Sequence, residues 1–167
     1  MSKHLIYFFF YLFSLVLFFS CSSPRNSIEE GDMAPDFKSE TVNDVSFSLA
    51  NTKGKKILIH FWADWCSECR AEFPKLEEAY QKYKNDNFEI IAVNVGQSGK
   101  HVKSFVDEFN LTFPMLLDEQ SEIAKQYGIR GLPTNFFVDE NMYVTKIIIG
   151  WVDEKQINQI INEGAGK

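Results

Sequence analysis

The chain has 167 residues, of which 45% are hydrophobic and 15% aromatic, and it carries a formal net charge of -6. Once an apolar N-terminal stretch is set aside, about 140 residues remain, which suits one domain with its own core. Because the chain is mildly acidic and has no long basic run, nothing in its composition favours nucleic acid as a partner, and we expect none.

The first 21 residues have the pattern of an export signal. Lys3 precedes an apolar run over Leu5–Phe19, and a positive start before an apolar middle is typical of secretory signals. The run is shorter than the roughly 17–25 residues of a membrane-spanning helix. Residues 17–22 resemble a bacterial lipoprotein signal, which implies lipidation of Cys21, although Phe18 stands where leucine is usual. An uncleaved anchor, ordinary cleavage and a leader thiol without a role are the alternatives. We expect an extracytoplasmic domain, tethered on the periplasmic side of a bacterial membrane.

Residues 22–31 are polar, contain Pro24 and show no periodicity. They are predicted to be a flexible tether, with residues 32–167 as the folded domain. Short alternating runs over 36–49 predict a β-hairpin around Asn43-Asp44. A continuous apolar run over 57–63 then predicts a strand buried on both faces.

The chain beyond this strand alternates between helical and extended patterns. A helical stripe covers 66–83, and Pro74 inside it is expected to kink the helix. The other predicted elements, in chain order, are a strand over 88–95, a helix near 102–109, a short strand over 115–117, a helix around 123–127, a hairpin of strands over 135–138 and 144–149, and a closing helix around 157–161. This order predicts an α/β fold with a mixed central sheet flanked by helices.

The chemistry is predicted to reside in Cys66 and Cys69, the two cysteines after the leader. Cys66 falls where the buried strand ends and the helix begins, so unpaired backbone N–H groups and the helix dipole should lower the pKa of its thiol. Cys69 lies one turn further on the same face. The predicted cycle is attack on a disulfide by Cys66 and resolution of the mixed disulfide by Cys69.

Three other uses of such a pair are weaker. A closed zinc site needs four ligands, and His4, His60 and His101 are not paired at ligand spacing. Haem attachment would need histidine directly after Cys69, where Arg70 stands. A structural disulfide closing so short a loop would add little stability. We therefore expect no metal and no cofactor.

The residues around the pair resemble those of a known superfamily. Trp62-Ala63-Asp64-Trp65-Cys66-Ser67-Glu68-Cys69, followed by Pro74, is similar to the thioredoxin active-site helix. Gly131-Leu132-Pro133-Thr134 resembles the cis-proline loop of that superfamily. The resemblance implies that Pro133 faces the cysteines and that Leu132, Trp65, Ser67 and Glu68 contact the substrate. A simple turn before a strand is the alternative for Pro133.

More narrowly, the chain is similar to TlpA/ResA-type thiol–disulfide oxidoreductases of bacteria. The opening segment Gly31–Phe37, Glu72 three residues after Cys69, and an insertion between Val95 and Thr134 carry this resemblance. It implies a thioredoxin-like fold with an N-terminal β-hairpin and a central helix–strand insertion. It also implies reduction of disulfides in exported proteins, apocytochrome c among them, with a membrane thiol reductase as electron donor. We expect a monomer.

Three side chains are predicted to tune the pair. Glu72 is placed to exchange protons with it, and burial would raise the pKa of Glu72; a solvated helix glutamate is the alternative. His60 stands where cytosolic thioredoxins carry a buried acid and is hypothesised to assist deprotonation of Cys69; a hydrogen-bonded core histidine is the alternative. Glu68 adds negative charge beside the thiolates, which should bring the potential nearer about −270 mV than about −120 mV.

Two rival functions follow from the same residues. Ala34-Pro35-Asp36-Phe37 is shared with peroxiredoxins, but Ala63 stands where their nucleophile is usually preceded by threonine. A tethered copper- or haem-handling chaperone would use both thiolates as soft ligands, with His101 as a further ligand. Peroxide consumption and metal affinity are the measurements that separate these readings from an oxidoreductase.

Overall fold

The structure is a computed structural model that describes residues 27–162. The predicted leader, the lipidation predicted at Cys21 and residues 22–26 of the predicted tether lie outside the described residues. Within residues 27–162, no helix has the length and apolar character needed to cross a membrane.

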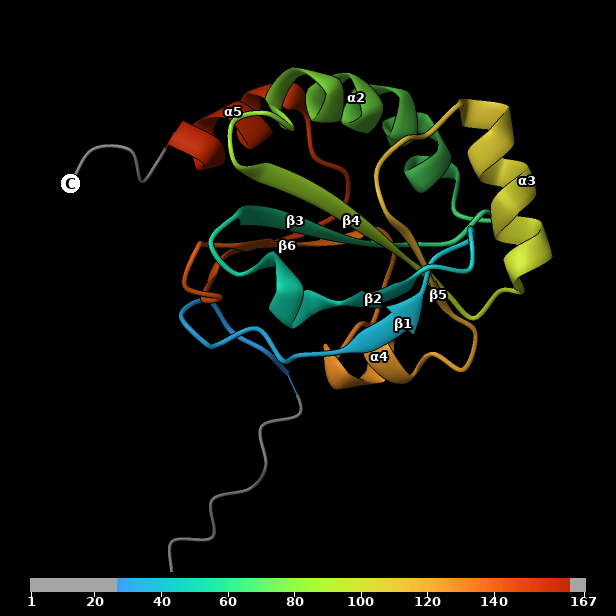
Figure 1. Cartoon of the computed structure of the whole chain (residues 1–167), viewed down its shortest axis with the longest axis horizontal. Helices are drawn as coiled ribbons and strands as arrows, with labels where there is room; N and C mark the ends of the chain where they lie inside the picture. Colours follow the sequence, from blue (N-terminus) through green and yellow to red (C-terminus); the bar gives the residue numbers. More distant parts are fainter. Residues whose placement is uncertain (1–26, 163–167) are drawn as a thin grey trace, which may run out of the picture.

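The elements predicted from the sequence are present, with ends that differ by a few residues (Figure 1). In chain order they are β1 (Lys38–Glu40), β2 (Ser46–Ser48), the 3-10 turn η2 (Leu49–Thr52), β3 (Lys56–Trp62), α2 (Ser67–Tyr83), β4 (Phe88–Val95), α3 (Gly99–Phe109), β5 (Met115–Asp118), α4 (Glu122–Gln126), β6 (Thr134–Val138), β7 (Val144–Ile149) and α5 (Glu154–Asn162).

The central sheet has five strands in the order β5-β4-β3-β6-β7. Strands β3, β4 and β5 are parallel, while β6 runs antiparallel to β3 and β7 antiparallel to β6. The antiparallel β1–β2 hairpin forms a second, two-stranded sheet. The predicted mixed sheet with an N-terminal hairpin is confirmed.

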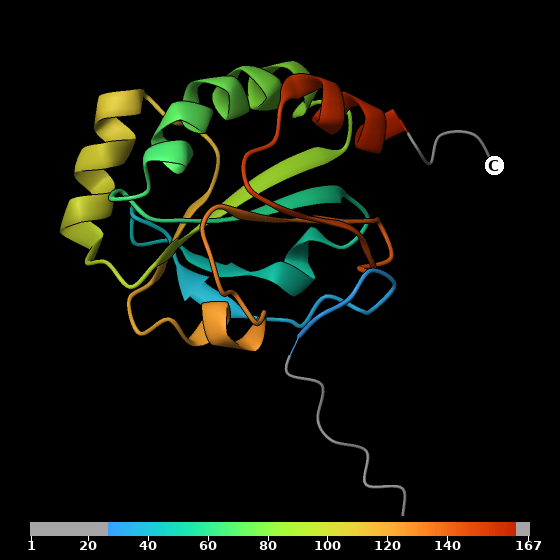
Figure 2. The ribbon, with the colours of Figure 1, turned by 180° about the vertical axis from the view of Figure 1, so that it is seen from behind.

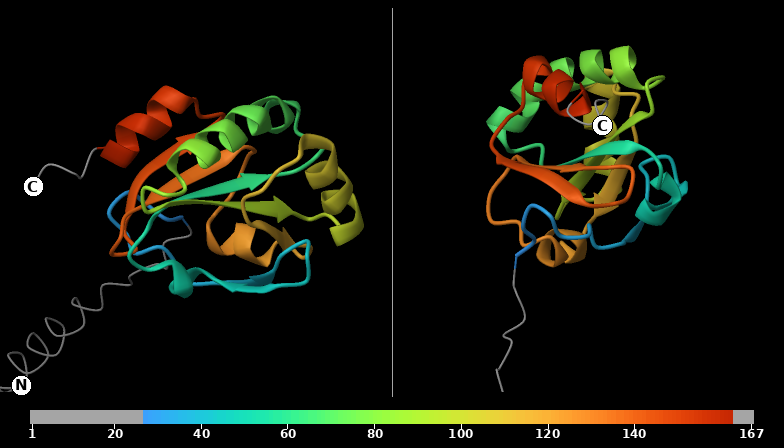
Figure 3. Two further views of the ribbon diagram at one scale, coloured as in Figure 1. Left: turned by 45° about the horizontal axis from the view of Figure 1, so that its top comes forward. Right: turned by 90° about the vertical axis from the view of Figure 1, so that its left-hand side faces the viewer.

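Helices α2, α3 and α5 pack on one face of the sheet, and α4 and the β1–β2 hairpin lie on the other (Figures 2 and 3). Alternate residues of β3 point to opposite faces. Leu58 and Trp62 belong to the core beneath α2, whereas Ile59 and Phe61 belong to the core beneath α4. His60, between them, therefore faces α2. This alternation places a histidine under the helix that carries the cysteines.

An aromatic cluster fixes α2 and α3 on the sheet. The ring centroids of Trp62 and Phe73 are 4.7 Å apart, those of Trp62 and Phe105 4.5 Å, and those of Phe73 and Phe105 5.0 Å. Such pairs contribute about 0.5–1.5 kcal/mol each beyond their buried area. Pro74, next to Phe73, has no N–H to donate to the preceding turn, and the axis of α2 bends along its length (Figures 1 and 2). The aromatic cluster thus holds α2 on the sheet through Phe73, two turns after Cys66.

The folded domain begins earlier than predicted. Ile28 packs against the core beneath α4. The Gly31 N–H donates to the Val144 carbonyl at 2.7 Å, and Glu30 forms an ion pair with Lys146 at 3.2 Å. Residues 28–31, assigned to the tether because they are polar and aperiodic, thus extend along the edge strand β7. Backbone pairing does not require apolar side chains, so the sequence pattern carried no sign of it.

Candidate active site

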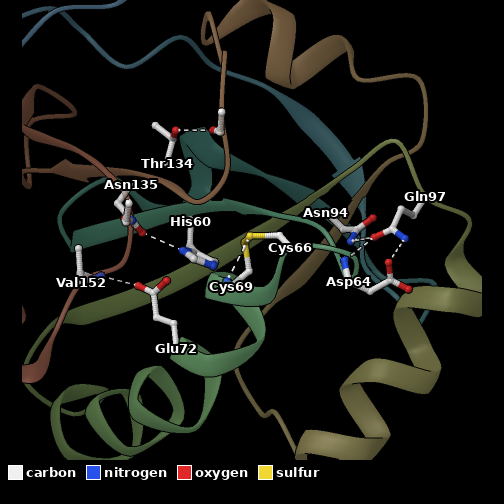
Figure 4. The surroundings of a disulfide bond; sticks show 12 residues. His60, Asp64, Cys66, Cys69, Glu72, Asn94, Gln97, Thr134, Asn135 and Val152 are labelled. Atoms are coloured by element: carbon white, nitrogen blue, oxygen red, sulfur yellow. Dashed lines mark hydrogen bonds between the residues drawn. A yellow bond between two sulfur atoms is a disulfide. The ribbon is translucent and has the colours of Figure 1, made fainter.

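Cys66 and Cys69 are joined by a disulfide at the N-terminus of α2 (Figure 4). The S–S distance is 2.13 Å and the Cα–Cα distance 5.3 Å. Cys66 is the N-cap residue, and its Sγ accepts a hydrogen bond from the Cys69 N–H at 3.2 Å. An N–H at this place, together with the helix dipole, stabilises negative charge on the Cys66 sulfur once the disulfide is reduced.

The two sulfurs differ in access. Cys66 is 7% exposed and Cys69 is 0% exposed. Of the two residues, Cys66 alone has surface in contact with solvent. This difference favours Cys66 as the residue that meets a client, the role that the sequence analysis predicts for it.

Glu72 lies one turn beyond Cys69 and is completely buried. Its Oε1 accepts a hydrogen bond from the Val152 N–H at 2.7 Å, while its Oε2 has no hydrogen-bond partner among the described residues. Burial is the main cause that raises the pKa of Glu72, from 4.5 to about 8. The hydrogen bond from Val152 opposes this shift, and the charge of Glu68 adds to it. The carboxyl is therefore neutral at pH 7.

His60 is also completely buried, and its ring lies edge-on to Phe73. Its Nδ1 is 2.8 Å from the Asn135 Oδ1. The Asn135 Nδ2 donates to the Gly150 carbonyl at 2.7 Å, so the amide oxygen must face the histidine and Nδ1 must carry the proton. Burial lowers the pKa of His60 from 6.5 to about 4, although the hydrogen bond to Asn135 opposes the shift.

The neutral ring of His60 leaves Nε2 as an unprotonated acceptor. This nitrogen has no partner among the described residues, and Figure 4 shows it turned toward the disulfide. His60 and Glu72 thus bring to the side of the cysteine pair two buried polar atoms that have no partner within residues 27–162. Both features proposed for His60 from the sequence, a hydrogen-bonded core histidine and a group beneath the pair, are present together.

A side-chain network holds the loop that precedes Cys66. The Gln97 Oε1 accepts hydrogen bonds from the Asp64 N–H at 2.8 Å and from the Asn94 Nδ2 at 2.9 Å. The Gln97 Nε2 in turn donates to the Asp64 carboxylate. Because β4 runs parallel to β3, its carboxyl end lies beside the end of β3, and Asn94 and Gln97 can reach this loop (Figure 4).

The loop before β6 contains a cis peptide bond between Leu132 and Pro133. Pro133 is buried, and half-buried Leu132 packs against the core cluster that includes both cysteines. Thr134 pairs with Phe61 at the end of β3, which brings the loop to the cysteine end of the sheet. The cis-proline feature that the resemblance implies is present in this place.

The other predicted substrate contacts are exposed around the pair. Trp65 is 71% exposed, and Ser67 and Glu68 are exposed on the first turn of α2. His101 is exposed and lies within hydrogen-bond distance of Ser98. Among residues 27–162, no group of three or more His, Cys, Asp or Glu side chains is arranged to hold a metal ion.

Comparison with known proteins gives one consistent relationship. A profile of the AhpC/TSA family matches residues 30–147. The chain belongs to this family. It is 36% identical to the thiol-disulfide oxidoreductase ResA of Geobacillus thermodenitrificans over 135 residues, which are 81% of this chain and 78% of that protein.

Solved structures agree with this AhpC/TSA-family assignment. A putative thiol:disulfide interchange protein DsbE from Chlorobium tepidum superposes with a TM-score of 0.78 at 30% identity, covering 84% of this chain and all of that one. The exposed lipoprotein thioredoxin of Streptococcus pneumoniae superposes with a TM-score of 0.68 at 28% identity, covering 77% of this chain and 99% of that one. The predicted recognition is confirmed: this AhpC/TSA-family chain is a thiol–disulfide oxidoreductase of the ResA/DsbE type.

Several residues of the oxidoreductase site were not predicted. Asn94, Gln97, Asn135 and Val152 hold the loop, the histidine and the glutamate in place. A signal was available for the two asparagines, because each is a polar residue inside a strand that is otherwise apolar. A buried polar residue in such a strand needs a partner. Val152 acts through its backbone, for which the sequence holds no signal.

Proposed function

We propose that this AhpC/TSA-family oxidoreductase reduces disulfides of exported proteins through a Cys66–Cys69 dithiol/disulfide cycle. The observation that carries the proposal is the pairing of an accessible Cys66 at the N-cap of α2 with a fully buried Cys69 one turn beneath it. This arrangement supplies one sulfur for the client and one for release of the client.

The proposed cycle conserves electrons and protons. The Cys66 thiolate attacks one sulfur of the client disulfide, forming a mixed disulfide and releasing the other client sulfur, which takes up a proton. Cys69 then loses its proton and attacks the Cys66 Sγ, which expels the second client sulfur as a thiol. The client gains two electrons and two protons, and the enzyme is left with the Cys66–Cys69 disulfide. A membrane thiol reductase is the proposed donor of the two electrons that restore the dithiol.

Glu72 and His60 are proposed to divide the proton transfers. Glu72 is a neutral acid at pH 7, since its pKa is raised to about 8, so it can donate a proton to a departing sulfur. His60 is a neutral imidazole whose Nε2 faces the pair, so it can accept a hydrogen bond from the Cys69 thiol. Because their surroundings shift the two pKa values in opposite directions, Glu72 suits the role of acid and His60 the role of base.

The reducing direction is supported by the charge of Glu68, which is exposed on the first turn of α2 beside the pair. Negative charge here disfavours the thiolate forms of the cysteines, and destabilising the reduced state makes a couple more reducing. The proposed potential is accordingly nearer about −270 mV than about −120 mV.

The proposed location is the periplasmic side of a bacterial membrane, with Cys21 as the lipidated residue. The signal-like pattern of the first 21 residues supports this. The name of the pneumococcal relative, an exposed lipoprotein thioredoxin, describes such a location for that protein. Apocytochrome c is proposed as one client, on the resemblance to the TlpA/ResA group alone.

A redox titration combined with two activity assays tests the proposal. The oxidised domain is equilibrated with defined dithiol/disulfide buffers, and reduction of insulin and consumption of hydrogen peroxide are followed in parallel. We expect a potential near about −270 mV, insulin reduction that requires both cysteines, and little peroxide consumption. A potential near about −120 mV would reverse the direction, and rapid peroxide consumption would favour the peroxidase alternative.

A further inference from the structure

Asn135 is a completely buried amide beside the redox site, and both its side-chain oxygen and its side-chain nitrogen form hydrogen bonds. The Oδ1 is 2.8 Å from the His60 Nδ1, and the Nδ2 donates to the Gly150 carbonyl at 2.7 Å. The Gly150 N–H in turn donates to the Pro133 carbonyl at 2.8 Å. The amide of Asn135 is therefore held between the imidazole and the backbone of the segment that follows β7.

This chain of hydrogen bonds runs in one direction. The Gly150 carbonyl can only accept, so the Asn135 nitrogen must face it and the Asn135 oxygen must face His60. That oxygen can only accept, so the ring nitrogen opposite it must donate. On unrelated folds, a third group that binds the far nitrogen of a histidine in this way selects which ring nitrogen is left to take up a proton. Here the nitrogen left without a proton is turned toward the cysteine pair (Figure 4).

No second group within residues 27–162 competes with Asn135 for the tautomer of His60, because the Nε2 has no hydrogen-bond partner there. The neighbours of His60 on the adjoining strands are Ala92 of β4 and Asn135 of β6, neither of which titrates. Residues 150–152 carry no titratable side chain. The titratable groups beside the ring are the cysteine pair and Glu72, all on α2 (Figure 4).

We infer that Asn135 is a positioning residue for the resolution step: it fixes the proton of His60 on Nδ1 and thereby makes Nε2 the base for the Cys69 thiol. The inference rests on the proposed function, in which Cys69 resolves the mixed disulfide. It deepens that function by adding a third member behind the histidine, held by the backbone next to the cis-proline loop.

The resolution step conserves protons with this assignment. The Cys69 sulfur attacks the Cys66 Sγ, and the proton of Cys69 passes to the His60 Nε2. The client sulfur leaves with the proton of Glu72. Transfer of one proton from the imidazolium to the Glu72 carboxylate then restores both groups. The Asn135 oxygen accepts from Nδ1 throughout, so the ring keeps its orientation while its charge changes.

The test separates attack from resolution with the small symmetrical disulfide of thionitrobenzoate. Reduced protein in an excess of this reagent releases two thionitrobenzoate anions in sequence. The first is released by attack of Cys66, at a rate that depends on reagent concentration, and the second by resolution through Cys69, at a rate that does not. Thionitrobenzoate departs as a thiolate, so the second rate does not depend on a proton from Glu72. Stopped-flow absorbance gives both rates.

We expect Asn135→Leu to slow the second phase about tenfold or more, since a positioned general base contributes about 10²–10⁴-fold, and to change the first phase by less than about twofold. In the background of His60→Asn, which removes the base itself, the same substitution should cause no further loss, because groups that act as a unit are not additive. Asn141→Leu is the matched control, since it makes the same change at an exposed asparagine in the turn after β6, and it should leave both phases unchanged.

The tautomer is read directly by proton–nitrogen correlation NMR of the histidine rings, with the His60 signals assigned from their loss in His60→Asn. We expect wild type to carry the proton on Nδ1 and none on Nε2. Asn135→Leu should lose this preference. A wild-type ring protonated on Nε2 would overturn the inference, and that result needs no variant of Asn135.

Equal second-phase rates of wild type and Asn135→Leu would also overturn the inference. An equal loss in the His60→Asn background would do the same, because it would indicate a structural role. The proposed function is judged separately. If insulin reduction requires both cysteines while the second phase is unchanged in Asn135→Leu, the inference fails and the oxidoreductase stands. If insulin is not reduced, the proposed function fails while the tautomer and the second phase remain measurable.

Discussion

Glu72 gives the most quantitative prediction, because its burial ties the stability of the fold to pH. Its pKa is 4.5 without the protein environment and about 8 in the folded protein. Between these values the folded state holds a proton that the unfolded state has lost. The contribution of Glu72 to stability should therefore fall as pH rises from 4.5 to about 8, by about 1.4 kcal/mol per pH unit and about 5 kcal/mol in total.

Replacing Glu72 with Gln removes this dependence. The amide oxygen of Gln can still accept the hydrogen bond from Val152, so the fold should tolerate the change. We expect the free energy of unfolding of Glu72→Gln, relative to wild type, to rise with pH by about 1.4 kcal/mol per unit up to about pH 8 and then to level off. Urea unfolding of the oxidised proteins at pH 5, 6, 7 and 8 measures this.

The matched control is Glu78→Gln, which changes an exposed glutamate on the same helix. Its stability difference from wild type should be independent of pH over the same range. Parallel curves for wild type and Glu72→Gln would refute the reasoning, because they would mean that the folded protein does not hold a proton on this carboxyl at neutral pH.

Three further predictions concern the surroundings of the pair. Because the pKa of His60 falls from 6.5 to about 4 on burial, the contribution of His60 to wild-type stability should fall by about 3 kcal/mol as pH drops through that window, opposite in sign to the contribution of Glu72. The free energy of unfolding of His60→Asn relative to wild type should rise by this amount as pH drops, and the variant should slow resolution by Cys69. Unchanged resolution rates across pH would remove its catalytic role. Glu68→Gln should lower the pKa of Glu72, because the charge of Glu68 raises it in wild type. In the same urea series, the stability of this variant should therefore stop falling at a lower pH than that of wild type. Gln97→Ala leaves Asp64 N–H and Asn94 without their partner, which should cost about 1–3 kcal/mol in urea unfolding, against no measurable loss for exposed Gln120→Ala.

The sequence predicted the elements of this fold because its apolar patterns are strong. The short apolar run over 57–63 is typical of a buried strand, and the stripe over 66–83 is typical of an amphipathic helix. The position of Cys66 at their junction followed from the same patterns. The order in which the strands pair in the sheet was harder to predict, since it depends on contacts between residues far apart in the chain.

What the sequence could not predict are contacts made by backbone groups and by long-range polar pairs. The bond from Val152 N–H to Glu72 joins positions that no local pattern relates. The proton position on His60 depends on the orientation of Asn135, which in turn depends on the Gly150 carbonyl. The pairing of residues 28–31 with β7 is likewise a backbone contact in a polar segment.

The central claim is that Cys66 attacks the client and Cys69 releases it. The most direct measurement is to react the reduced Cys69→Ala variant with a disulfide-containing client protein and to locate the mixed disulfide by mass spectrometry. The account predicts a stable adduct on Cys66 and none for the matched Cys66→Ala variant, whose remaining sulfur is buried. An adduct on Cys69 in Cys66→Ala, or release of reduced client by Cys69→Ala at the wild-type rate, would contradict it.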